Sequence, residues 1–423
     1  MIRQVYSAVF CAAIPAILAR LWWRGRTLPA YRERWGERFA QFPAIKFDRP
    51  VIWVHTVSVG EFIAAKPMID QLLARNTHEL VVTTMTPTGS ERVRASYGDR
   101  VFHVYAPYDI PALTDRFLAK TTPVLAIFLE TELWPNLLNS CFKAGVPSVL
   151  ANARLSEKSA RGYRKTGALA RTMLNQLTLA VIQNAADAER FKALGLAPEK
   201  AVVSGSIKFD ITVDHALRER AATLKHLLSA NGACKVWIAA STHKGEDEQI
   251  LDAFQMLREK LPDHRLILVP RHPERFQDVY ELCCSRGYRT LRRSACSDQA
   301  EVGDFDIFLG DTMGELMLLF GCANAAFVGG SFVANGGHNT IEPAAWGLPI
   351  VSGPSQFNFA AVSKLLADAG ALQTATNASE LSAALFGLLT TADGAERGRS
   401  AQAVAQENQG ALACLLHKIE QFL

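Results

Sequence analysis

Residues 327–359 read FVGGSFVANGGHNTIEPAAWGLPIVSGPSQFNF. The apolar run that ends at Val328 predicts a buried strand, and the two glycine pairs that follow let the backbone turn tightly and come close to a ligand. Asn339 or Thr340 can cap a short helix that ends near Gly347, after which PIVSG predicts a new strand. Because the exposed N–H groups of a helix start attract phosphate, the stretch predicts a strand, a phosphate-binding loop and a helix.

Glu342 stands in the first turn of that predicted helix, and His338 lies beside it. The Glu342 carboxylate could accept hydrogen bonds from both hydroxyls of a ribose, or it could do no more than cap its own helix. The spacing is not G-x-G-x-x-G, so the dinucleotide fingerprint is absent. The glycine-rich loop, the His-Asn pair and the Glu-Pro pair together resemble the nucleotide-sugar side of a two-domain glycosyltransferase.

The length and composition indicate a globular protein of two domains. The chain has 423 residues, of which 49% are hydrophobic and 20% charged, and domains of about 200 residues are usual at this length. The net charge of +4 is unevenly placed, since residues 1–50 carry nine basic and three acidic residues. A basic N-terminus on an otherwise nearly neutral chain argues against a nucleic-acid-binding protein and for contact with an anionic membrane surface.

The eight cysteines show no C-x-x-C spacing and no regular framework. They are therefore expected to be free thiols in a reducing compartment, and a zinc site is not expected. No Asp and His cluster has metal-ligand spacing, and neither a P-loop nor a G-x-S-x-G elbow occurs. No metal and no cofactor are predicted.

The N-terminal segment is apolar over residues 5–19, apart from Tyr6 and Ser7. This is short for a full membrane span, which usually takes about 20 residues. A cleaved signal peptide is one alternative, but no small-x-small site follows the apolar run. The tryptophans and arginines that come next suit a membrane interface and keep that side cytoplasmic. Residues 1–26 are therefore predicted to form a helix that anchors a cytoplasmic enzyme, either tilted in the membrane or lying in its interface.

From Pro50 onward, short apolar runs alternate with helical segments. Such alternation predicts an α/β protein with doubly wound parallel sheets that are covered on both faces. The pattern breaks near residue 211, so the predicted domains are residues 27–211 and 212–423. Two facing Rossmann-like domains are expected to leave a ligand-binding cleft at the carboxyl ends of their strands. The clearest runs are VIWVH, ELVVTT and VLAIFLE in the first half and KVWIAAS, RLILVP and AAFVGG in the second.

Each candidate residue of the first half follows a predicted strand. Glu61 opens a helix, whose positive N-terminal field is expected to lower its pKa and keep it ionised as a general base; alternatively it only stabilises the helix. Glu130 and Glu132 point the same way if the chain is extended there, and they either pair with basic residues or bind acceptor hydroxyls. Lys208 either holds an anionic substrate group or is an ordinary surface lysine.

The loops of the second half supply hydroxyl, imidazole, guanidinium and backbone N–H groups after predicted strands. One anionic nucleotide ligand would explain all of them. Glu246 and Glu248 are expected to be solvated helix acids, and Met313 is either a contact for a base or a core residue. The candidates in these loops are Ser241, His243, Arg271, His272, Met313 and Gly314.

The chain resembles the 3-deoxy-D-manno-octulosonic acid (Kdo) transferases of lipopolysaccharide assembly in seven motifs that extend to about residue 360. The resemblance implies a GT-B fold, with an acceptor-binding domain over residues 27–211 and a donor-binding domain over residues 212–423. It implies CMP-Kdo as the donor and a lipid A precursor as the acceptor, at the cytoplasmic face of the inner membrane. The motifs are HTVSVGE, LETELWPN, SGSIKFD, STHKGEDE, RHPERF, GDTMGEL and FVGGSF…GGHNTIEP.

In this family the glutamate of the first loop is the catalytic base, and the resemblance implies that Glu61 has this role here. The resemblance implies an inverting single displacement, in which this base takes the proton of the acceptor hydroxyl while CMP leaves. A transferase or epimerase for a uridine sugar, a nucleotide-binding oxidoreductase and a non-catalytic membrane scaffold are alternatives. The acceptor side is assigned Glu130, Glu132 and Lys208. The donor side is assigned Ser241, His243, Arg271, His272, Met313, Gly314, Gly337, His338, Asn339 and Glu342.

Overall fold

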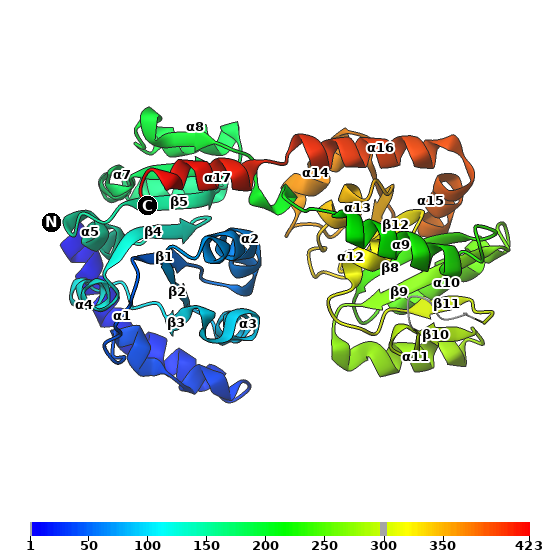
Figure 1. Cartoon of the computed structure of the whole chain (residues 1–423), viewed down its shortest axis with the longest axis horizontal. Helices are drawn as coiled ribbons and strands as arrows, with labels where there is room; N and C mark the ends of the chain where they lie inside the picture. The colour runs from blue at the N-terminus through cyan, green and yellow to red at the C-terminus, as the bar shows by residue number, and fades with distance from the viewer. Residues whose placement is uncertain (1, 297–302) are drawn as a thin grey trace. The chain divides into compact units, whose positions relative to one another are not determined.

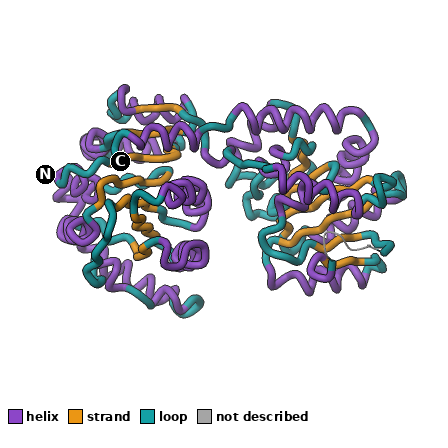
Figure 2. Tube along the Cα trace, in the orientation of Figure 1, coloured by secondary structure: helices purple, strands orange, loops and turns teal. Residues whose placement is uncertain are grey.

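The computed structural model describes residues 2–296 and 303–423. The chain divides into two compact units. Unit 1 runs to Asp210 and includes Gln409–Leu423, whereas unit 2 is Ile211–Asn408. Each unit is a parallel sheet between layers of helices (Figure 2), which is the arrangement that alternating strands and helices predict.

Unit 1 is built on seven parallel strands in the order β3-β2-β1-β4-β5-β6-β7 (Figure 1). The order reverses between β1 and β4, and sheets of this kind bind ligands beyond the carboxyl ends of the strands at such a reversal. The strands are β1 (Val51–His55), β2 (Glu79–Thr84), β3 (Phe102–Tyr105), β4 (Pro123–Leu129), β5 (Ser148–Ala153), β6 (Leu179–Ile182) and β7 (Ala201–Val203).

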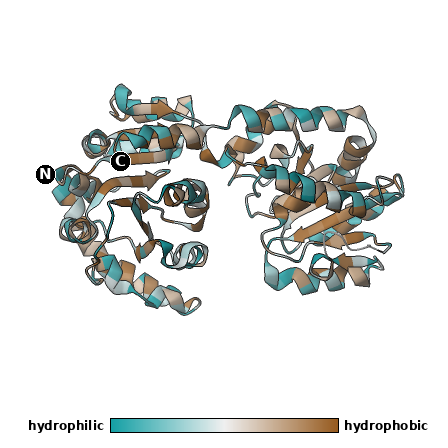
Figure 3. Ribbon diagram, viewed as in Figure 1, coloured by the Kyte–Doolittle hydropathy of each residue, from teal (hydrophilic) through white to brown (hydrophobic). Residues whose placement is uncertain are grey.

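The strands of unit 1 are apolar because helices cover both faces of the sheet, as the brown strands of Figure 3 show. Trp53 and Phe128 pack against α4, α5, α7 and α8 on one face, whereas Ile52 and Val54 pack against α2, α3 and α17 on the other. The helices are α1 (Ile2–Arg24), α2 (Val59–Arg75), α3 (Pro87–Tyr97), α4 (Pro111–Thr121), α5 (Pro135–Lys143), α6 (Glu157–Lys165), α7 (Gly167–Gln176), α8 (Ala185–Ala193) and α17 (Ala411–Glu420).

Unit 2 repeats the architecture with strand order β10-β11-β9-β8-β12-β13-β14, and its order reverses between β8 and β12. Its strands are β8 (Lys235–Thr242), β9 (His264–Pro270), β10 (Thr290–Arg292), β11 (Ile307–Leu309), β12 (Ala325–Val328), β13 (Ile350–Ser352) and β14 (Leu372–Thr374). Its helices are α9 (His215–Leu228), α10 (Asp247–Arg258), α11 (Phe276–Ser285), α12 (Leu316–Gly321), α13 (Ile341–Ala345), α14 (Ala360–Asp368), α15 (Ala378–Thr390) and α16 (Ala392–Glu407).

The C-terminal helix α17 belongs to unit 1, so the prediction that residues 212–423 form one domain is wrong for residues 409–423 (Figure 1). Leu412, Leu415 and Ile419 lie on one face of this helix and are buried in the apolar layer that also holds α2. The Asp210 carboxylate accepts hydrogen bonds from the backbone N–H groups of Gly410 and Leu412, both over 2.6 Å. These bonds satisfy donors at the start of α17.

Among the described residues, α1 is the helix that is long and apolar enough to cross a membrane, with a mean hydropathy of 1.7. It contacts α5 and α7 of unit 1, and both Arg3 and Ser7 donate hydrogen bonds to the Asn136 side chain, over 3.0 and 3.1 Å. Its opposite face is exposed and apolar, with Val9 65% accessible. Half-buried positions recur at residues 3, 6, 7, 10, 13, 14, 17, 18 and 21, so one face of the helix lies against protein along most of its length.

Candidate active site

The candidate residues of unit 1 lie at the carboxyl edge of its sheet. Glu61 follows β1, Glu130 and Glu132 follow β4, and Lys208 lies in the 3-10 turn after β7. β1 and β4 are the strands between which the strand order reverses. The fold therefore brings these side chains to the edge at which doubly wound sheets bind ligands.

Glu61 is held by hydrogen bonds at the start of α2. Its Oε2 accepts from the Val57 backbone N–H over 2.7 Å and its Oε1 accepts from the Ser58 hydroxyl over 3.1 Å. Ser58 caps the helix in return by accepting the Glu61 N–H. Burial, followed by the charge of Glu130, raises the pKa of Glu61 despite these bonds. The expectation of a lowered pKa is therefore wrong, because desolvation outweighs the field of the helix N-terminus.

Glu130 and Lys208 form an ion pair with a distance of 3.0 Å between Nζ and Oε1. Arg154 binds the other carboxylate oxygen of Glu130 over 2.7 Å, and Glu130 is only 6% exposed. The structure thus supports pairing with basic residues, one of the two alternatives for this acid. Lys208 is not an ordinary surface lysine, because it has a buried partner.

The chain turns at Glu130 and Thr131, so the extended geometry on which the expectation for Glu130 and Glu132 depended is not formed. The Oε2 atom of Glu132 accepts a hydrogen bond from the Trp134 indole over 2.7 Å. Burial, and then the nearby charge of Glu61, raises the pKa of Glu132 to about 7. Glu61 and Glu132 are therefore close enough for the charge of one to disfavour ionisation of the other.

Asn152 is a residue of this edge that sequence reasoning missed. It is 1% exposed, and its Oδ1 accepts a hydrogen bond from the backbone N–H of Ile207, next to Lys208, over 3.2 Å. Both Asn152 and Glu130 have a left-handed backbone, with φ of 52° and 55°. Strained non-glycine residues at two neighbouring strand ends are typical of functional sites. Asparagine tolerates this conformation. Because Asn152 lies in a run of residues that predicts a strand, the sequence does not mark it as a site residue.

In unit 2, three histidines meet beyond β8, β9 and β12. The Nε2 atoms of His243 and His338 are 2.8 Å apart and their rings are stacked, while His272 packs edge-on against His243. Burial and the charge of Arg271 lower the pKa of His338 to about 4, and burial lowers the pKa of His243. The roles of these histidines as ligand contacts stay predictions. The structure brings their imidazoles close to the Arg271 guanidinium, and together these groups suit an anion.

Glu246 is a buried anchor for the same loops and not the solvated helix acid that the sequence suggested. It is 0% exposed. Its Oε2 accepts hydrogen bonds from the backbone N–H groups of His243 and Gly330, over 2.8 and 2.7 Å. Its Oε1 accepts hydrogen bonds from those of Ser331 and Phe332, over 3.0 and 2.9 Å. One carboxylate therefore joins the loop after β8 to the glycine-rich loop after β12.

Asn339 holds Glu342 in the predicted helix start. The Asn339 amide donates to Glu342 Oε1 over 3.1 Å, and its own oxygen accepts the N–H of Ile341 over 3.1 Å. Asn339 thus serves as the cap, whereas Thr340 forms no side-chain capping bond. Burial raises the pKa of Glu342, and the hydrogen bond from Asn339, followed by the charge of Arg271, opposes this shift. The Glu342 carboxylate is bound to the Asn339 side chain, which leaves acceptor capacity for a ligand hydroxyl.

The remaining donor-side candidates lie in loops with unusual backbone geometry. Ser241, the second-last residue of β8, has a φ of 60°. Gly314 and Gly337 have φ of 87° and 73°, which explains the glycines at these positions. Met313 is 60% exposed, so it is not a core residue. Its thioether is free to contact an apolar ligand surface.

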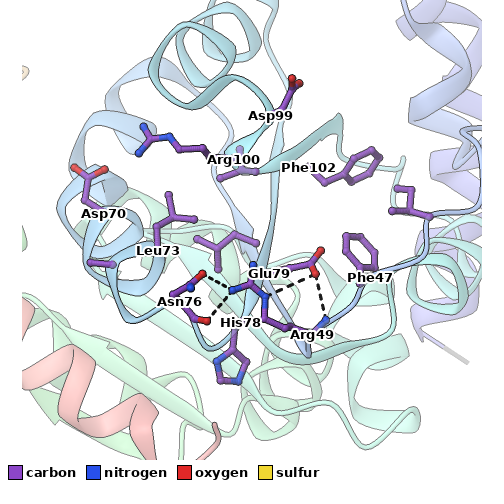
Figure 4. A pocket seen from close by; sticks show the side chains of 14 residues that line it. Phe47, Arg49, Asp70, Leu73, Asn76, His78, Glu79, Asp99, Arg100 and Phe102 are labelled. Atoms are coloured by element: carbon purple, nitrogen blue, oxygen red, sulfur yellow. Dashed lines mark hydrogen bonds and ion pairs between the residues drawn. The ribbon is translucent and has the colours of Figure 1, made fainter.

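A cavity of about 720 Å³ opens at the opposite, amino-terminal edge of the unit 1 sheet (Figure 4). Its two arginines already have partners, because Arg49 donates to the Asn76 carbonyl over 2.7 Å and Arg100 donates to the Ser96 carbonyl over 2.9 Å. Within residues 2–296 and 303–423, no group of three or more His, Cys, Asp and Glu could hold a metal ion.

Solved structures with the same fold include MurG from Acinetobacter baumannii, at a TM-score of 0.56 and 12% identity over 88% of this chain and 99% of that chain. The UDP-GlcNAc 2-epimerase from Neisseria meningitidis matches at a TM-score of 0.55 and 13% identity, over 88% of this chain and 100% of that chain. These similarities confirm a GT-B fold.

Sequence relatives share far more than the fold. Residues 33–211 match the family model described as 3-Deoxy-D-manno-octulosonic-acid transferase (kdotransferase). The 3-deoxy-D-manno-octulosonic acid transferase of Haemophilus influenzae is 40% identical over 100% of this chain and 99% of its own length, and that of Bordetella pertussis is 34% identical over the same shares. The chain belongs to the 3-deoxy-D-manno-octulosonic acid transferase family and is a glycosyltransferase of lipopolysaccharide biosynthesis.

Proposed function

We propose that this transferase moves Kdo from CMP-Kdo to a lipid A precursor, lipid IVA, with inversion at the anomeric carbon and with Glu61 as the general base. The observation that most supports the proposal is the Glu61 carboxylate, which two hydrogen bonds orient while burial raises its pKa. A carboxylate with a raised pKa accepts a proton more readily near neutral pH.

In the proposed step Glu61 takes the proton of the acceptor hydroxyl as the hydroxyl oxygen bonds to the anomeric carbon of Kdo. The bond from that carbon to the phosphate oxygen breaks, and its electron pair leaves with CMP. The products are an inverted glycosidic bond and a phosphate monoester. Glu61 then returns its proton to water.

The donor carries a phosphate and a carboxylate, both of which need cations or N–H donors. We assign this role to Arg271 and to the imidazoles of His243, His272 and His338, which can gain protons when an anion binds. Lys208, a candidate for the same role, is already paired with Glu130, so we assign it to holding that carboxylate. Glu342 is assigned to the ribose hydroxyls.

Incubation of the purified protein with CMP-Kdo and tetraacylated lipid A precursor, followed by mass measurement of the lipid, tests the proposal. The lipid should gain the mass of Kdo, and CMP but not UDP should inhibit the reaction. A lipid of unchanged mass would overturn the proposed acceptor. Inhibition by UDP alone would instead favour a uridine-sugar enzyme, the first alternative from the sequence.

The titration of Glu132 should report the charge of Glu61. Burial, and then the charge of Glu61, raises the pKa of Glu132 to about 7. Glu61→Gln removes that charge, so the pKa of Glu132 should fall. Carbon-13 nuclear magnetic resonance of the glutamate carboxyl groups, recorded from acid to neutral pH, checks this. Glu189→Gln on the exposed surface of α8 is the control, and an unmoved Glu132 titration in Glu61→Gln would exclude the coupling.

We further propose that α1 anchors the enzyme at the cytoplasmic face of the inner membrane, lying in the interface with its exposed apolar face in lipid. Deletion of residues 1–25 should then give a soluble and folded protein, because α1 holds no fully buried residue. The full chain should sediment with anionic vesicles and the shortened chain should not. Circular dichroism checks folding, and a shortened chain that unfolds, or still sediments, would contradict the anchor.

A further inference from the structure

A second cavity in unit 1, of about 410 Å³, lies between α1, the loop after β4, and helices α6 and α7. Tyr6 of α1 lines it on one side, and Glu132 lines it from the loop. Most of the remaining wall is apolar and comes from Leu133, Trp134, Pro135, Leu169, Ala170 and Met173. An apolar wall of this kind favours a ligand portion without polar groups.

The cavity connects two features that the transfer reaction needs. Glu132 contributes to its lining, and the charge of Glu61 raises the pKa of Glu132, which places the proposed base close by. Tyr6 belongs to the helix whose other face is exposed and apolar. An extended ligand that starts near Glu61 and continues through the cavity therefore reaches α1, the helix that we place at the membrane.

The neighbouring helix α6 is strongly basic. Its sequence EKSARGYRK carries one acid, and its basic side chains are exposed. The two cavity-lining residues Tyr163 and Thr166 lie on or directly after this helix, so the helix that carries the positive charge borders the cavity. A basic helix beside an apolar cavity complements an amphiphile with a negative headgroup.

We propose that this cavity receives an acyl chain of the lipid acceptor, while the basic face of α6 contacts the negative charge of its headgroup. This inference rests on the proposed function, because it takes the acceptor to be a lipid. The shape of the cavity would then help to select the acceptor by its acyl chain. Contacts with the sugar part of the acceptor would select it as well.

Leu169→Trp fills part of the cavity from a half-buried position of α7. Thr172→Trp, on the exposed face of the same helix, is the matched control. With Leu169→Trp, the KM for the acylated acceptor should rise about tenfold more than the KM for a deacylated acceptor, since a few methylene groups lose their site. Thr172→Trp should raise neither. Equal effects on both acceptors, or equal effects of both variants, would overturn the proposal.

A binding experiment without CMP-Kdo separates this inference from the transfer reaction. The probe is tetraacylated lipid A precursor with a diazirine in one acyl chain, cross-linked to the full chain and mapped by peptide mass. Labels in α7 and in residues 131–135 are expected, and excess phosphatidylglycerol should not displace them. Labels confined to α1, or displaced by phosphatidylglycerol, would show a general membrane contact and overturn the proposal. Loss of transfer activity with these labels intact would count against the proposed function alone.

Discussion

Glutamine in place of Glu61 should abolish Kdo transfer while CMP binding stays intact. The amide oxygen can still accept one of the hydrogen bonds from Val57 and Ser58, so the start of α2 is kept. The amide cannot take a proton from the acceptor hydroxyl. Loss of general-base catalysis typically lowers a rate by about 100- to 10,000-fold. Initial rates at saturating substrate measure the loss of transfer, and calorimetric titration measures the retained binding of CMP.

Glu157 offers a matched control, because it is also an acid in the first turn of a serine-capped helix of unit 1. Glu157→Gln removes the same charge from a helix start and should leave turnover unchanged. Both variants lose the interaction of an acid with the helix dipole, about 0.3–1 kcal/mol of stability, and Glu61→Gln also loses one of the two hydrogen bonds that its carboxylate accepts. A Glu61→Gln enzyme with near-normal turnover would remove Glu61 from the role of base.

Much of the fold can be predicted from the sequence because buried parallel strands leave a clear pattern. The run VIWVH, for example, corresponds to β1, which is buried over its whole length. The sequence does not show in the same way which of the two units α17 packs against. Its apolar spacing indicates that one face is buried, but periodicity carries no information on which of the two sheets receives that face.

The positions of the candidate residues could be predicted well from the sequence, whereas their pKa shifts and burial could be predicted less well. Glu61 stands at a strand end followed by a helix, which is a local pattern. The direction of its pKa shift depends on burial and on Glu130, which lies far away in the sequence. Glu246 shows the same limitation, since an acid at a helix start is usually solvated. Only the approach of residues 330–332 in three dimensions turns it into a buried acceptor.

Replacing Glu246 with glutamine should weaken CMP binding about a hundredfold. A glutamine side chain has one acceptor oxygen, so its amide would face two of the four backbone N–H groups that the carboxylate now binds. Each buried N–H that loses its acceptor costs about 1–3 kcal/mol, which the loops can avoid only by moving apart. Such movement would separate His243 from His338, whose contact depends on both loops.

Calorimetric titration of CMP separates this positioning role from a general loss of structure. Partial unfolding would lower the number of binding sites per chain and leave the affinity of each site unchanged. A displaced loop would lower the affinity with all sites retained, and the imidazole signals of His243 and His338 would change in nuclear magnetic resonance spectra. Glu248→Gln, at an exposed position in the first turn of the same helix, should do neither. Unaltered affinity in Glu246→Gln would mean that the carboxylate only stabilises unit 2 and that the two loops hold their positions without it.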